Sequence, residues 1–487
     1  MIFPTKEKFL ELAKDYNNVT VYREIAGDLF TPISLLRNFS NEKYLFLLES
    51  ANLDKTFSRY SFFGFNPKKI VKFKGGKLFV ESGSKKTEVD LNPIDYLNHE
   101  VSSFKGYADN LFGDFCGGYV GYFGYEMANY FGFLREKIRE DSKSDLMAFM
   151  LVDEFFVFDN HFGKMYAAKS VITKGDPAKN YDLALKRLND MANIILRFNF
   201  DNFDSDIDVQ VEKDFSKDEF VETVKKIKQD IENGELIQCV LSNRYLLKGK
   251  INPVTLYRTL RNINPSPYMF YLKFNDYVLT GSSPEIHLKV VGKKGILKPI
   301  AGTYPVEDDI EKTKRSLLSD KKEIAEHLML LDLARNDLYT GCNNVKVDKS
   351  FQAEVYSHVV HIVSEVSGEM RDDENALKLF MKTFPAGTVT GAPKVRAMEL
   401  INNYEKSKRG FYAGCAGYIS FNGNLDTCIT IRSALVKKNE TIFRAGAGIV
   451  YDSDPEKEYL EVERKLAAIN ASIKRIKNLE VDNVFVS

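Results

Sequence analysis

The sequence predicts an α+β fold with large antiparallel β-sheets and helices on the outside. Strand-like and helical segments are intermixed along the 487 residues, without the regular strand–helix–strand order of a parallel α/β protein. Apolar runs joined by a glycine turn, as at Lys74-Gly75-Gly76-Lys77, are typical of hairpins between antiparallel strands. The chain shows no internal repeat and no low-complexity tract.

Composition indicates an ordinary globular protein. Hydrophobic residues make up 44% of the chain and charged residues 28%, which is enough for a sizeable core. Lysine and arginine together number 68, as do aspartate and glutamate, and this balance argues against nucleic acid or an anionic membrane as the main partner. The N-terminus turns charged at once and no apolar run could span a bilayer, so we expect neither a signal peptide nor a membrane segment. Five cysteines without CxxC spacing favour reduced thiols in the cytoplasm.

The first region, residues 1–200, is predicted to consist mainly of strands. A short helical pattern opens it, and a glycine-rich stretch at 117–124 marks a place where backbones pack closely. Residues 201–214 are acidic and poor in aliphatic side chains, so we expect an exposed linker there. The strand-like stretches are 19–25, 43–50, 60–65 and 69–80, and a helical pattern covers 181–196.

The second region, residues 215–475, alternates helices with strands, and we expect it to interlock with the first as one globular unit. Helical periodicity covers 216–233, 253–262, 308–340, 374–382 and a segment ending at 405. Strand-like stretches are 237–247, 268–274, 277–285, 295–305 (a hairpin), 358–367, 414–421 and 427–436.

Residues 444–465 contain the first candidate site. Gly446-Ala447-Gly448 resembles a glycine turn, and Asp454-Pro455 fits the N-cap and first residue of a helix. Two glutamates one turn apart beside exposed backbone N–H groups can hold a hard cation and an anion side by side, although a solvated acidic edge gives the same pattern. The predicted buried stripe of the helix is Tyr459, Val462, Leu466, Ile469 and Ile473, and Glu458, Glu461 and Lys465 follow its edge.

A second pair of glutamates, Glu323 and Glu326, has the same spacing on the helix predicted at 308–340. Asp320 and Glu323 fit a capping box, which explains Glu323 without a metal, whereas Glu326 has no such explanation. If the two helices face each other, four carboxylates form an oxygen-only site suited to Mg²⁺. Sequence spacing alone does not establish that they meet.

Other polar candidates lie in loops and strands. Glycine–threonine turns at 299–303 and 387–394 either present N–H and hydroxyl donors to an anion or simply end elements. Arg432, in the strand predicted at 427–436, needs an anionic partner if it is buried. His361 lies in an apolar run, where a histidine is more often a core residue than a catalyst. Glu285, after Gly-Ser-Ser-Pro, is either an acid at a strand end or a turn residue.

Several stretches together resemble the chorismate-utilising enzymes, and within them the large components of anthranilate synthases. Five motifs in order make the resemblance specific although each is weak alone, and with two stretches of the first region it covers nearly the whole chain. It implies a two-sheet sandwich flanked by helices. The stretches are PIAGT (299–303), EIAEHLMLLDLARND (323–337), GTVTGAPK (387–394), DTCITIRSA (426–434) and GAGIVYDSDPEKEYLE (446–461), with TPISLL (31–36) and GGYVGYFGYE (117–126) in the first region.

Two positions separate the members of this family. Members that add water carry a lysine where this chain has Gln238, and members that make aminodeoxychorismate usually carry a lysine where it has Ala301. A lysine amine can act as a base or nucleophile once its pKa is lowered, and alanine cannot. The combination of Gln238 and Ala301 resembles enzymes that use ammonia directly and finish by eliminating pyruvate.

The resemblance assigns further roles by position. It implies Mg²⁺ as the cofactor, with Glu326 and Glu461 as ligands and Glu323 and Glu458 behind them. It makes Glu285 the general acid for the departing ring hydroxyl and puts His361 and Gln238 in the active site. The implied reaction joins ammonia to chorismate and releases pyruvate to give anthranilate, the first committed step of tryptophan biosynthesis. The implied substrate contacts are Gly302, Thr303, Tyr412, Arg432, Gly446, Ala447, Gly448 and Lys465.

The same resemblance implies a feedback site for L-tryptophan. Three of its residues closely follow Tyr412, so effector and substrate would share a strand, and occupation of one end would bias the other. The alternative is an ordinary strand end at 48–50 and an ordinary turn at 264–269. The implied effector residues are Leu48, Glu49, Ser50, Pro267, Tyr268, Met269, Ala416, Gly417 and Tyr418.

The cysteines also bear on the source of ammonia. None of Cys116, Cys239, Cys342, Cys415 and Cys428 lies in the G-x-C-x-G setting of a glutaminase, so glutamine-derived ammonia requires a separate amidotransferase subunit.

Two alternative functions stay open. One is aminodeoxychorismate synthase component I, against which Ala301 argues. The other is a non-catalytic amino-acid-binding relative, which is expected to have lost Glu326 and Glu461.

Overall fold

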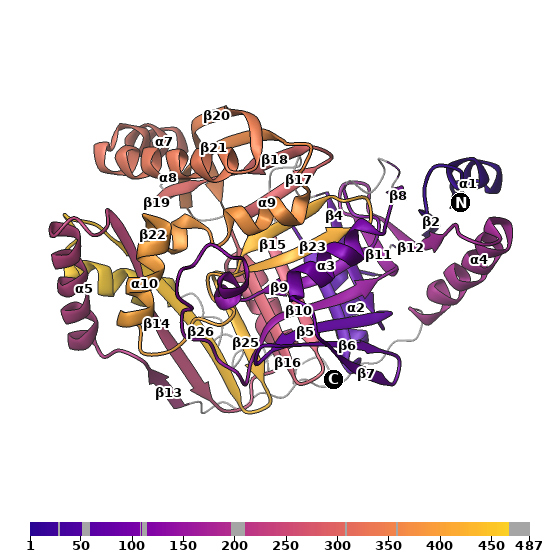
Figure 1. The fold of residues 1–487 in the computed structure, drawn as a ribbon, viewed down its shortest axis with the longest axis horizontal. Coiled ribbons are helices and arrows are strands. Elements are labelled where there is room, and N and C mark those ends of the chain that lie inside the picture. The colour runs from indigo at the N-terminus through magenta and orange to yellow at the C-terminus, as the bar shows by residue number, and fades with distance from the viewer. Residues whose placement is uncertain are drawn as a thin grey trace.

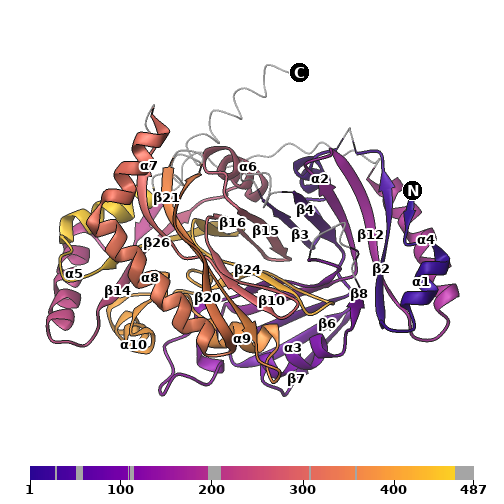
Figure 2. The same ribbon diagram turned by 90° about the horizontal axis from the view of Figure 1, so that it is seen from above.

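Two large β-sheets packed face to face and surrounded by helices make up the fold (Figures 1 and 2). The structure is a computed structural model that describes residues 1–27, 30–50, 59–107, 109, 114–195, 210–306, 309–356 and 359–466. Almost every strand pairing in it is antiparallel; β2 and β8 pair in parallel. The predicted α+β fold with two large antiparallel sheets and outer helices is confirmed.

The larger sheet has 14 strands and mixes the two regions of the sequence. At its centre β3 pairs with β15, so that Leu48 lies opposite Phe270. Short β22 (Gly391–Ala392) pairs with β14, and β8 (Gly106–Tyr107) pairs with β2. In order the main strands are β1 (Ile2–Phe3), β2 (Asn18–Ile25), β12 (Lys164–Ile172), β11 (Glu154–Asp159), β4 (Tyr60–Phe65), β3 (Tyr44–Glu49), β15 (Tyr268–Phe274), β16 (Tyr277–Ser283), β25 (Ser433–Lys437), β26 (Glu440–Ile449), β14 (Gln238–Lys248) and β13 (Gln210–Lys213).

The second sheet has 12 strands and also joins both regions, because β9 pairs with β23. An added Cβ on Gly121 of β9 would lie 2.0 Å from the Ala148 carbonyl oxygen, so the glycine-rich stretch does pack closely against its neighbour. In order the strands are β19 (Ile300–Pro305), β21 (Val359–Met370), β18 (Lys294–Leu297), β17 (Ile286–Val291), β24 (Leu425–Ile429), β23 (Cys415–Ser420), β9 (Gly118–Phe123), β10 (Asp145–Val152), β5 (Lys69–Lys74), β6 (Lys77–Ser82) and β7 (Lys85–Val89), with β20 (Cys342–Tyr356) beside β21.

The helices start at side-chain caps that the sequence provides. Ser216 and Glu219 form a complete capping box at α5, and Asp320 accepts N–H groups at the start of α8. Among the described residues, no helix has both the length and the apolar character needed to cross a bilayer. The helices are α1 (Lys6–Leu12), α2 (Pro32–Asn38), α3 (Pro93–Ser102), α4 (Pro177–Ile194), α5 (Lys217–Glu232), α6 (Pro253–Ile263), α7 (Ile310–Ser319), α8 (Lys321–Tyr339), α9 (Ala376–Thr383) and α10 (Lys394–Tyr404), with 3₁₀ turns η2 (Tyr125–Tyr130) and η3 (Gly387–Val389) and a helix over 455–466.

Two main cores hold the layers together. One lies between the sheets and contains side chains from both, such as Phe46 and Tyr119. The other lies between the larger sheet and its outer helices, where Phe9 of α1 and Val224 of α5 are fully buried. Figure 2 shows α1 and α4 against β2 and β12 at one end of this sheet. Burial of apolar surface on both faces explains why this sheet needs helices outside it.

Several predicted elements need correction. Gly446-Ala447-Gly448 is not a turn: it lies inside β26, paired with β14. The linker predicted at 201–214 ends in strand β13, and residues 201–209 lie outside the described residues. No sequence pattern predicted β20, a strand of 15 residues with bulges. In the helix over 455–466, Val462 and Leu466 are buried and Tyr459 is partly buried as predicted, while Ile469 and Ile473 lie outside the described residues.

Candidate functional site

The chain passes from one sheet to the other in two neighbouring segments, together called the crossing. Each segment contains one candidate residue. Glu285 lies between β16 of the larger sheet and β17 of the smaller one. Arg432 lies between β24 of the smaller sheet and β25 of the larger one. The Ile429 N–H donates to the Glu285 carbonyl at 3.0 Å, and the Ser282 N–H donates to the Arg432 carbonyl at 3.1 Å. The two segments therefore run side by side.

Arg432 is consequently not in a strand, which corrects the sequence prediction. Its backbone is left-handed, with φ of 50°, a conformation that residues other than glycine adopt rarely and often at functional sites. Its guanidinium is partly buried and lies 3.5 Å from the Asn264 Oδ1 atom. Burial lowers the pKa of Arg432, while the nearby Glu285 carboxylate opposes that shift. Such a group is a fitting partner for a carboxylate ligand.

Glu285 is a buried carboxyl group, with 8% of the residue exposed. Burial raises its pKa to about 7, against the opposing effects of the Thr388 hydroxyl, Arg432 and Lys465. A carboxylic acid with a pKa near 7 can hold a proton at neutral pH and give it up. Glu285 also lines a small cavity of about 30 Å³ with Thr388, which is room for one water-sized molecule.

The two glutamate-bearing helices bring their carboxylates within electrostatic reach of one another. Burial, followed by the charges of Glu323 and Glu461, raises the pKa of Glu326, which belongs to α8. Burial together with the charge of Glu461 raises the pKa of Glu458. The helix over 455–466 starts as predicted, with Asp454 Oδ1 accepting the N–H groups of its first turn. Carboxylates from helices more than a hundred residues apart therefore act electrostatically on one another.

The capping box predicted at α8 is only half formed. Asp320 Oδ1 accepts from the Glu323 N–H at 3.3 Å, but the Asp320 N–H donates to the Leu317 carbonyl. The Glu323 carboxylate is therefore not engaged in the reciprocal bond of a capping box. Burial and the charges of Asp320 and Glu461 raise its pKa.

Lys465 lies at the junction of these acidic groups. Its Nζ atom forms an ion pair of 2.7 Å with Glu461 and donates to the Gly446 carbonyl at 2.9 Å. Its positive charge also acts on Glu285, Glu326 and Glu458. The charge of one lysine therefore acts both on the crossing of the sheets and on the two glutamate helices.

The donor set fits a magnesium ion. Within the described part of the chain, no three His, Cys, Asp or Glu side chains stand in the geometry of a formed metal site. The four glutamates nevertheless offer oxygen alone, and the pKa values of Glu323, Glu326 and Glu458 are raised partly by like charge, which a divalent cation would relieve. Glu326 and Glu461 are the pair that would hold it, with Glu323 and Glu458 behind. Their role as ligands stays a prediction.

Strands β14 and β26 form a wall of the same region. Gln238 at the start of β14 lies against Gly448, since a Cβ added there would be 2.7 Å from the Gln238 Nε2 atom. A Cβ added to Gly446 would be 3.0 Å from the Tyr412 hydroxyl. Ala447 between them is fully buried. Both glycines therefore leave room for a neighbouring side chain.

The prediction that substrate and effector share one strand is wrong. Tyr412 precedes β23, the strand that carries the predicted effector residues Ala416, Gly417 and Tyr418.

His361 supports the turn of β19 that carries Gly302. Its Nδ1 atom lies 2.6 Å from the Gly302 carbonyl, so Nδ1 is the protonated nitrogen of a neutral ring. Burial lowers the pKa of His361 to about 4, which keeps the ring neutral. Gly302 has a φ of 67° at an irregularity in the pairing of β19 with β21. The Thr303 side chain lies outside the described residues.

The nine residues predicted for an effector line one cavity of about 430 Å³. This volume is in the range of about 300–1,000 Å³ typical of small-molecule sites. Within the described part of the chain, the buried Ser50 hydroxyl has no hydrogen-bond partner, so it is available to a ligand. The cavity is therefore a candidate binding site, and the nature of its ligand stays a prediction.

Sequence reasoning missed the charged part of this cavity. The Lys289 Nζ atom lies 2.8 Å from Asp114 and 3.3 Å from Asp426, and the Tyr268 hydroxyl donates to Asp426 at 2.9 Å. Lys289 lies on β17, a strand that was not predicted, and Asp426 immediately precedes the strand predicted at 427–436. Asp114 comes from the first region, and no pattern in the sequence connects it with them.

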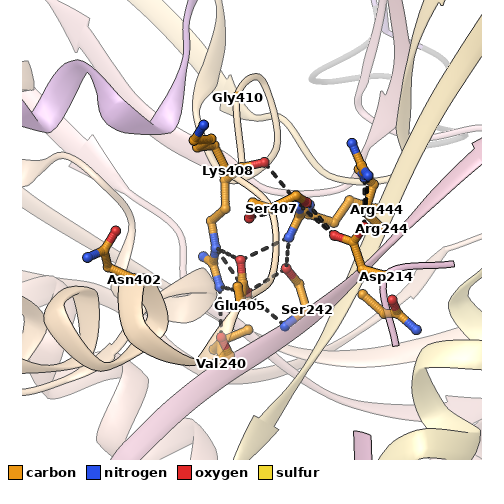
Figure 3. A network of polar contacts seen from close by, with 12 residues as sticks. Asp214, Val240, Ser242, Arg244, Asn402, Glu405, Ser407, Lys408, Gly410 and Arg444 are labelled. Atoms are coloured by element: carbon orange, nitrogen blue, oxygen red, sulfur yellow. Dashed lines mark hydrogen bonds and ion pairs between the residues drawn. The ribbon is translucent and has the colours of Figure 1, made fainter. Parts of the chain in front are cut away.

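A buried ion network beside Tyr412 was also missed (Figure 3). Glu405, at the C-cap of α10, pairs with Arg409 at 2.8 Å and with Arg444 of β26 at 2.9 Å. The three side chains are each only 2% exposed. The i, i+4 spacing of Glu405 and Arg409 was visible in the sequence, but Arg444 lies in a distant strand. The Arg409 guanidinium lies over the Tyr412 ring, 5.6 Å from its centre.

Comparisons with known proteins find sequence matches over nearly the whole chain. The profile of one family, described as chorismate binding enzyme, matches residues 28–471. Anthranilate synthase component 1 of Acetivibrio thermocellus is 39% identical and that of Aquifex aeolicus 37% identical, with 97% and 96% of this chain and 99% and 97% of the relative covered.

Among solved structures, anthranilate synthase component I from Streptococcus pneumoniae aligns with a TM-score of 0.75 and 32% identity, over 92% of this chain and 99% of that one. The menaquinone-specific isochorismate synthase from Escherichia coli aligns with a TM-score of 0.70 over 96% and 98% of the two chains. At 17% identity it shares the fold alone.

Proposed function

The chain belongs to the chorismate binding enzyme family, as an enzyme of the anthranilate synthase type, and from this premise we propose that it converts chorismate and ammonia into anthranilate and pyruvate. The observation that carries the proposal is the position of Lys465, whose charge reaches Glu285, Glu326, Glu458 and Glu461 at once. A cation, a proton donor and an anionic substrate can therefore be held together. The ring hydroxyl leaves as water, and elimination of the enolpyruvyl group then gives the aromatic amine.

Each residue contributes a defined step. Glu285, protonated near neutral pH, gives its proton to the departing ring hydroxyl. Arg432 binds a substrate carboxylate, and the N–H groups around Gly302 complete that contact. Mg²⁺, when bound by Glu326 and Glu461, supplies electrostatic stabilisation for the ring carboxylate and the leaving oxygen. The neutral His361 holds the Gly302 backbone in place.

Gln238 and Ala301 define which nucleophile is used. An amide has no basic nitrogen, so Gln238 cannot activate water, and Ala301 is a buried apolar residue that cannot attack the ring. The 1–200 and 215–475 regions share both sheets, and we propose that they work as one catalytic unit. Ammonia is then the nucleophile, delivered from glutamine by a separate amidotransferase subunit. All five cysteines of this chain are buried free thiols. A buried thiol cannot serve as the nucleophile of a glutaminase, which supports a separate partner subunit, and free thiols fit the proposed cytoplasmic location.

L-Tryptophan is the proposed occupant of the 430 Å³ cavity and inhibits the enzyme from there. The route to the active site is short, because Pro284 and Ile286 line this cavity and Glu285 stands between them. A ligand pressing on these two residues changes the position of the acid. This route replaces the shared strand expected from the sequence.

The proposal is tested by anthranilate fluorescence with the isolated chain, chorismate, Mg²⁺ and an ammonium salt. We expect fluorescence with ammonium and none with glutamine alone. A para-substituted product would favour the aminodeoxychorismate alternative. Binding of tryptophan without any turnover would favour the non-catalytic alternative.

A further inference from the structure

We propose that Arg409 is a positioning residue for the substrate pocket. Through the buried ion network around Glu405 (Figure 3), it fixes strands β14 and β26, and it also holds Tyr412 and the turn around η3. The inference rests on the proposed function, because it takes these segments to surround chorismate. Arg409 itself lies behind them and does not touch the substrate.

The hydrogen bonds of Arg409 reach several separate segments. Its Nη1 atom donates to the Val389 carbonyl of η3 at 2.7 Å, and its Nη2 atom donates to the Val240 carbonyl of β14 at 2.7 Å. The same Nη2 atom donates to Glu405 at 2.8 Å. A planar guanidinium presents these donors in fixed directions, so it sets the distance between the segments. A lysine ammonium at this position would keep the charge but not this fork.

Each contact lies next to a candidate site residue. Val240 is two residues from Gln238 on β14, and Val389 follows Thr388, which acts on Glu285. Arg444 is two residues from Gly446 on β26. Because side chains alternate along a strand, residues two apart point to the same face. A movement of Arg409 or Arg444 would therefore also move Gln238 and Gly446 in the strands that form the wall of the proposed substrate pocket.

Glu405 is the shared anion of the network. Burial opposes its ionisation, but Arg409 and Arg444 together lower its pKa below the ordinary value. It also accepts hydrogen bonds from the Ser242 N–H at 2.9 Å and the Ser242 hydroxyl at 2.6 Å. Well-packed apolar side chains often stabilise a fold as well as such a network does. The specific geometry of the fork is what an apolar replacement would lack.

The first region of the chain closes the network from its other side. Glu126 of η2 accepts the Arg409 N–H at 2.8 Å and the Gly410 N–H at 3.0 Å. The Arg409 guanidinium also lies over the Tyr125 ring, 4.7 Å from its centre. The backbone that leads from Arg409 to Tyr412 is therefore held by residues of both regions.

The test compares two arginine-to-lysine variants within the same network. Arg409→Lys removes the inner fork, and Arg244→Lys alters an outer arginine that pairs with Asp214 at 2.9 Å. For Arg409→Lys we expect kcat/KM for chorismate to fall about 100-fold, as small misplacements of a site can do, with the KM for ammonium close to wild type. Arg244→Lys should remain close to wild type. Equal kinetics of the two folded variants would overturn the inference.

A double-mutant cycle with Tyr412→Ala tests whether Arg409 acts through the tyrosine. If it does, Arg409→Lys should cost much less in the Tyr412→Ala background than in the wild type. Additive losses would overturn the inference. Should Arg409→Lys not fold, Ser242→Ala removes one hydroxyl from the network, and a folded variant with wild-type kcat/KM for chorismate would equally overturn it. Failure of the wild-type chain to form anthranilate would instead refute the proposed function.

Discussion

The Lys465 Nζ atom lies 2.7 Å from the Glu461 carboxylate, one helical turn away. A divalent cation bound by Glu461, as proposed, would compete with this ion pair for the same oxygen atoms. The ammonium group would then be available to a carboxylate of the proposed substrate. Binding of Mg²⁺ and of chorismate should therefore favour each other, with Lys465 passing from one partner to the other.

The first prediction concerns the proposed metal ligands. Glu326→Gln and Glu461→Gln keep the shape of the side chain but remove the charge that binds Mg²⁺, so we expect at least about a 100-fold loss of anthranilate formation at saturating chorismate. Melting curves should change little, since relief of like-charge repulsion offsets lost contacts. Glu456→Gln is the matched control, because Glu456 lies on the same helix but pairs with Lys217 at the surface. Wild-type turnover in the first two variants would contradict the assignment.

The second prediction is a pH dependence set by Glu285. Burial raises its pKa to about 7, so the group is protonated below that value and loses its proton as the pH rises through it. The reaction needs the protonated form, so kcat/KM for chorismate should fall above about pH 7. Glu285→Gln cannot transfer a proton, and its low residual rate should lack this limb. If kcat/KM of Glu285→Gln also falls above about pH 7, the fall belongs to a group other than Glu285.

Caps and periodicity made the helices predictable, whereas the role of the glycines was not. Ser216 and Glu219 define the start of α5 in the sequence as they do in the structure. Two glycines as close as Gly446 and Gly448 predict a turn, because glycine usually marks one. In the structure they are strand residues whose missing side chains leave space for Tyr412 and Gln238. Composition cannot distinguish a glycine that bends the chain from one that makes room.

The pairing of distant segments was the part that local pattern could not supply. The two glutamate helices could be identified separately, and their roles came from resemblance, but their meeting depends on the sheets. The bond from Arg409 N–H to Glu126 joins residues 283 positions apart. The cavity around Ser50 likewise needs Asp114 and Lys289 from different regions. Such contacts follow from strand order, which a single sequence does not specify.

The third prediction concerns Ser50 in the effector cavity, which is the cavity of about 430 Å³ proposed to bind tryptophan. Ser50→Phe places a large ring in the cavity and removes a buried hydroxyl available to a ligand. We expect the tryptophan concentration for half inhibition to rise at least about tenfold, equivalent to about 1.4 kcal/mol of binding free energy. Activity without tryptophan should stay near wild type, which serves as the internal control for folding. Undiminished inhibition would exclude tryptophan from this cavity.

The fourth prediction separates tryptophan binding from its effect. Pro284 and Ile286 line the effector cavity, and Glu285 between them lines the small cavity of about 30 Å³, which Ile286 also lines. Ile286 therefore lies between a ligand in the effector cavity and the segment that carries the acid. Ile286→Ala leaves a gap between the ligand and this segment, so bound tryptophan should no longer displace Glu285 fully.

The measurement is residual activity at saturating tryptophan, with binding followed separately by calorimetry. Ile286→Ala should bind tryptophan yet keep a substantial fraction of its activity. Ile296→Ala is the matched control: this isoleucine lines the same cavity on β18 but does not adjoin the acid. It should bind more weakly and still be fully inhibited once saturated, because truncation there lowers affinity without changing the coupling. Complete inhibition of saturated Ile286→Ala would show that the signal reaches the active site by another path.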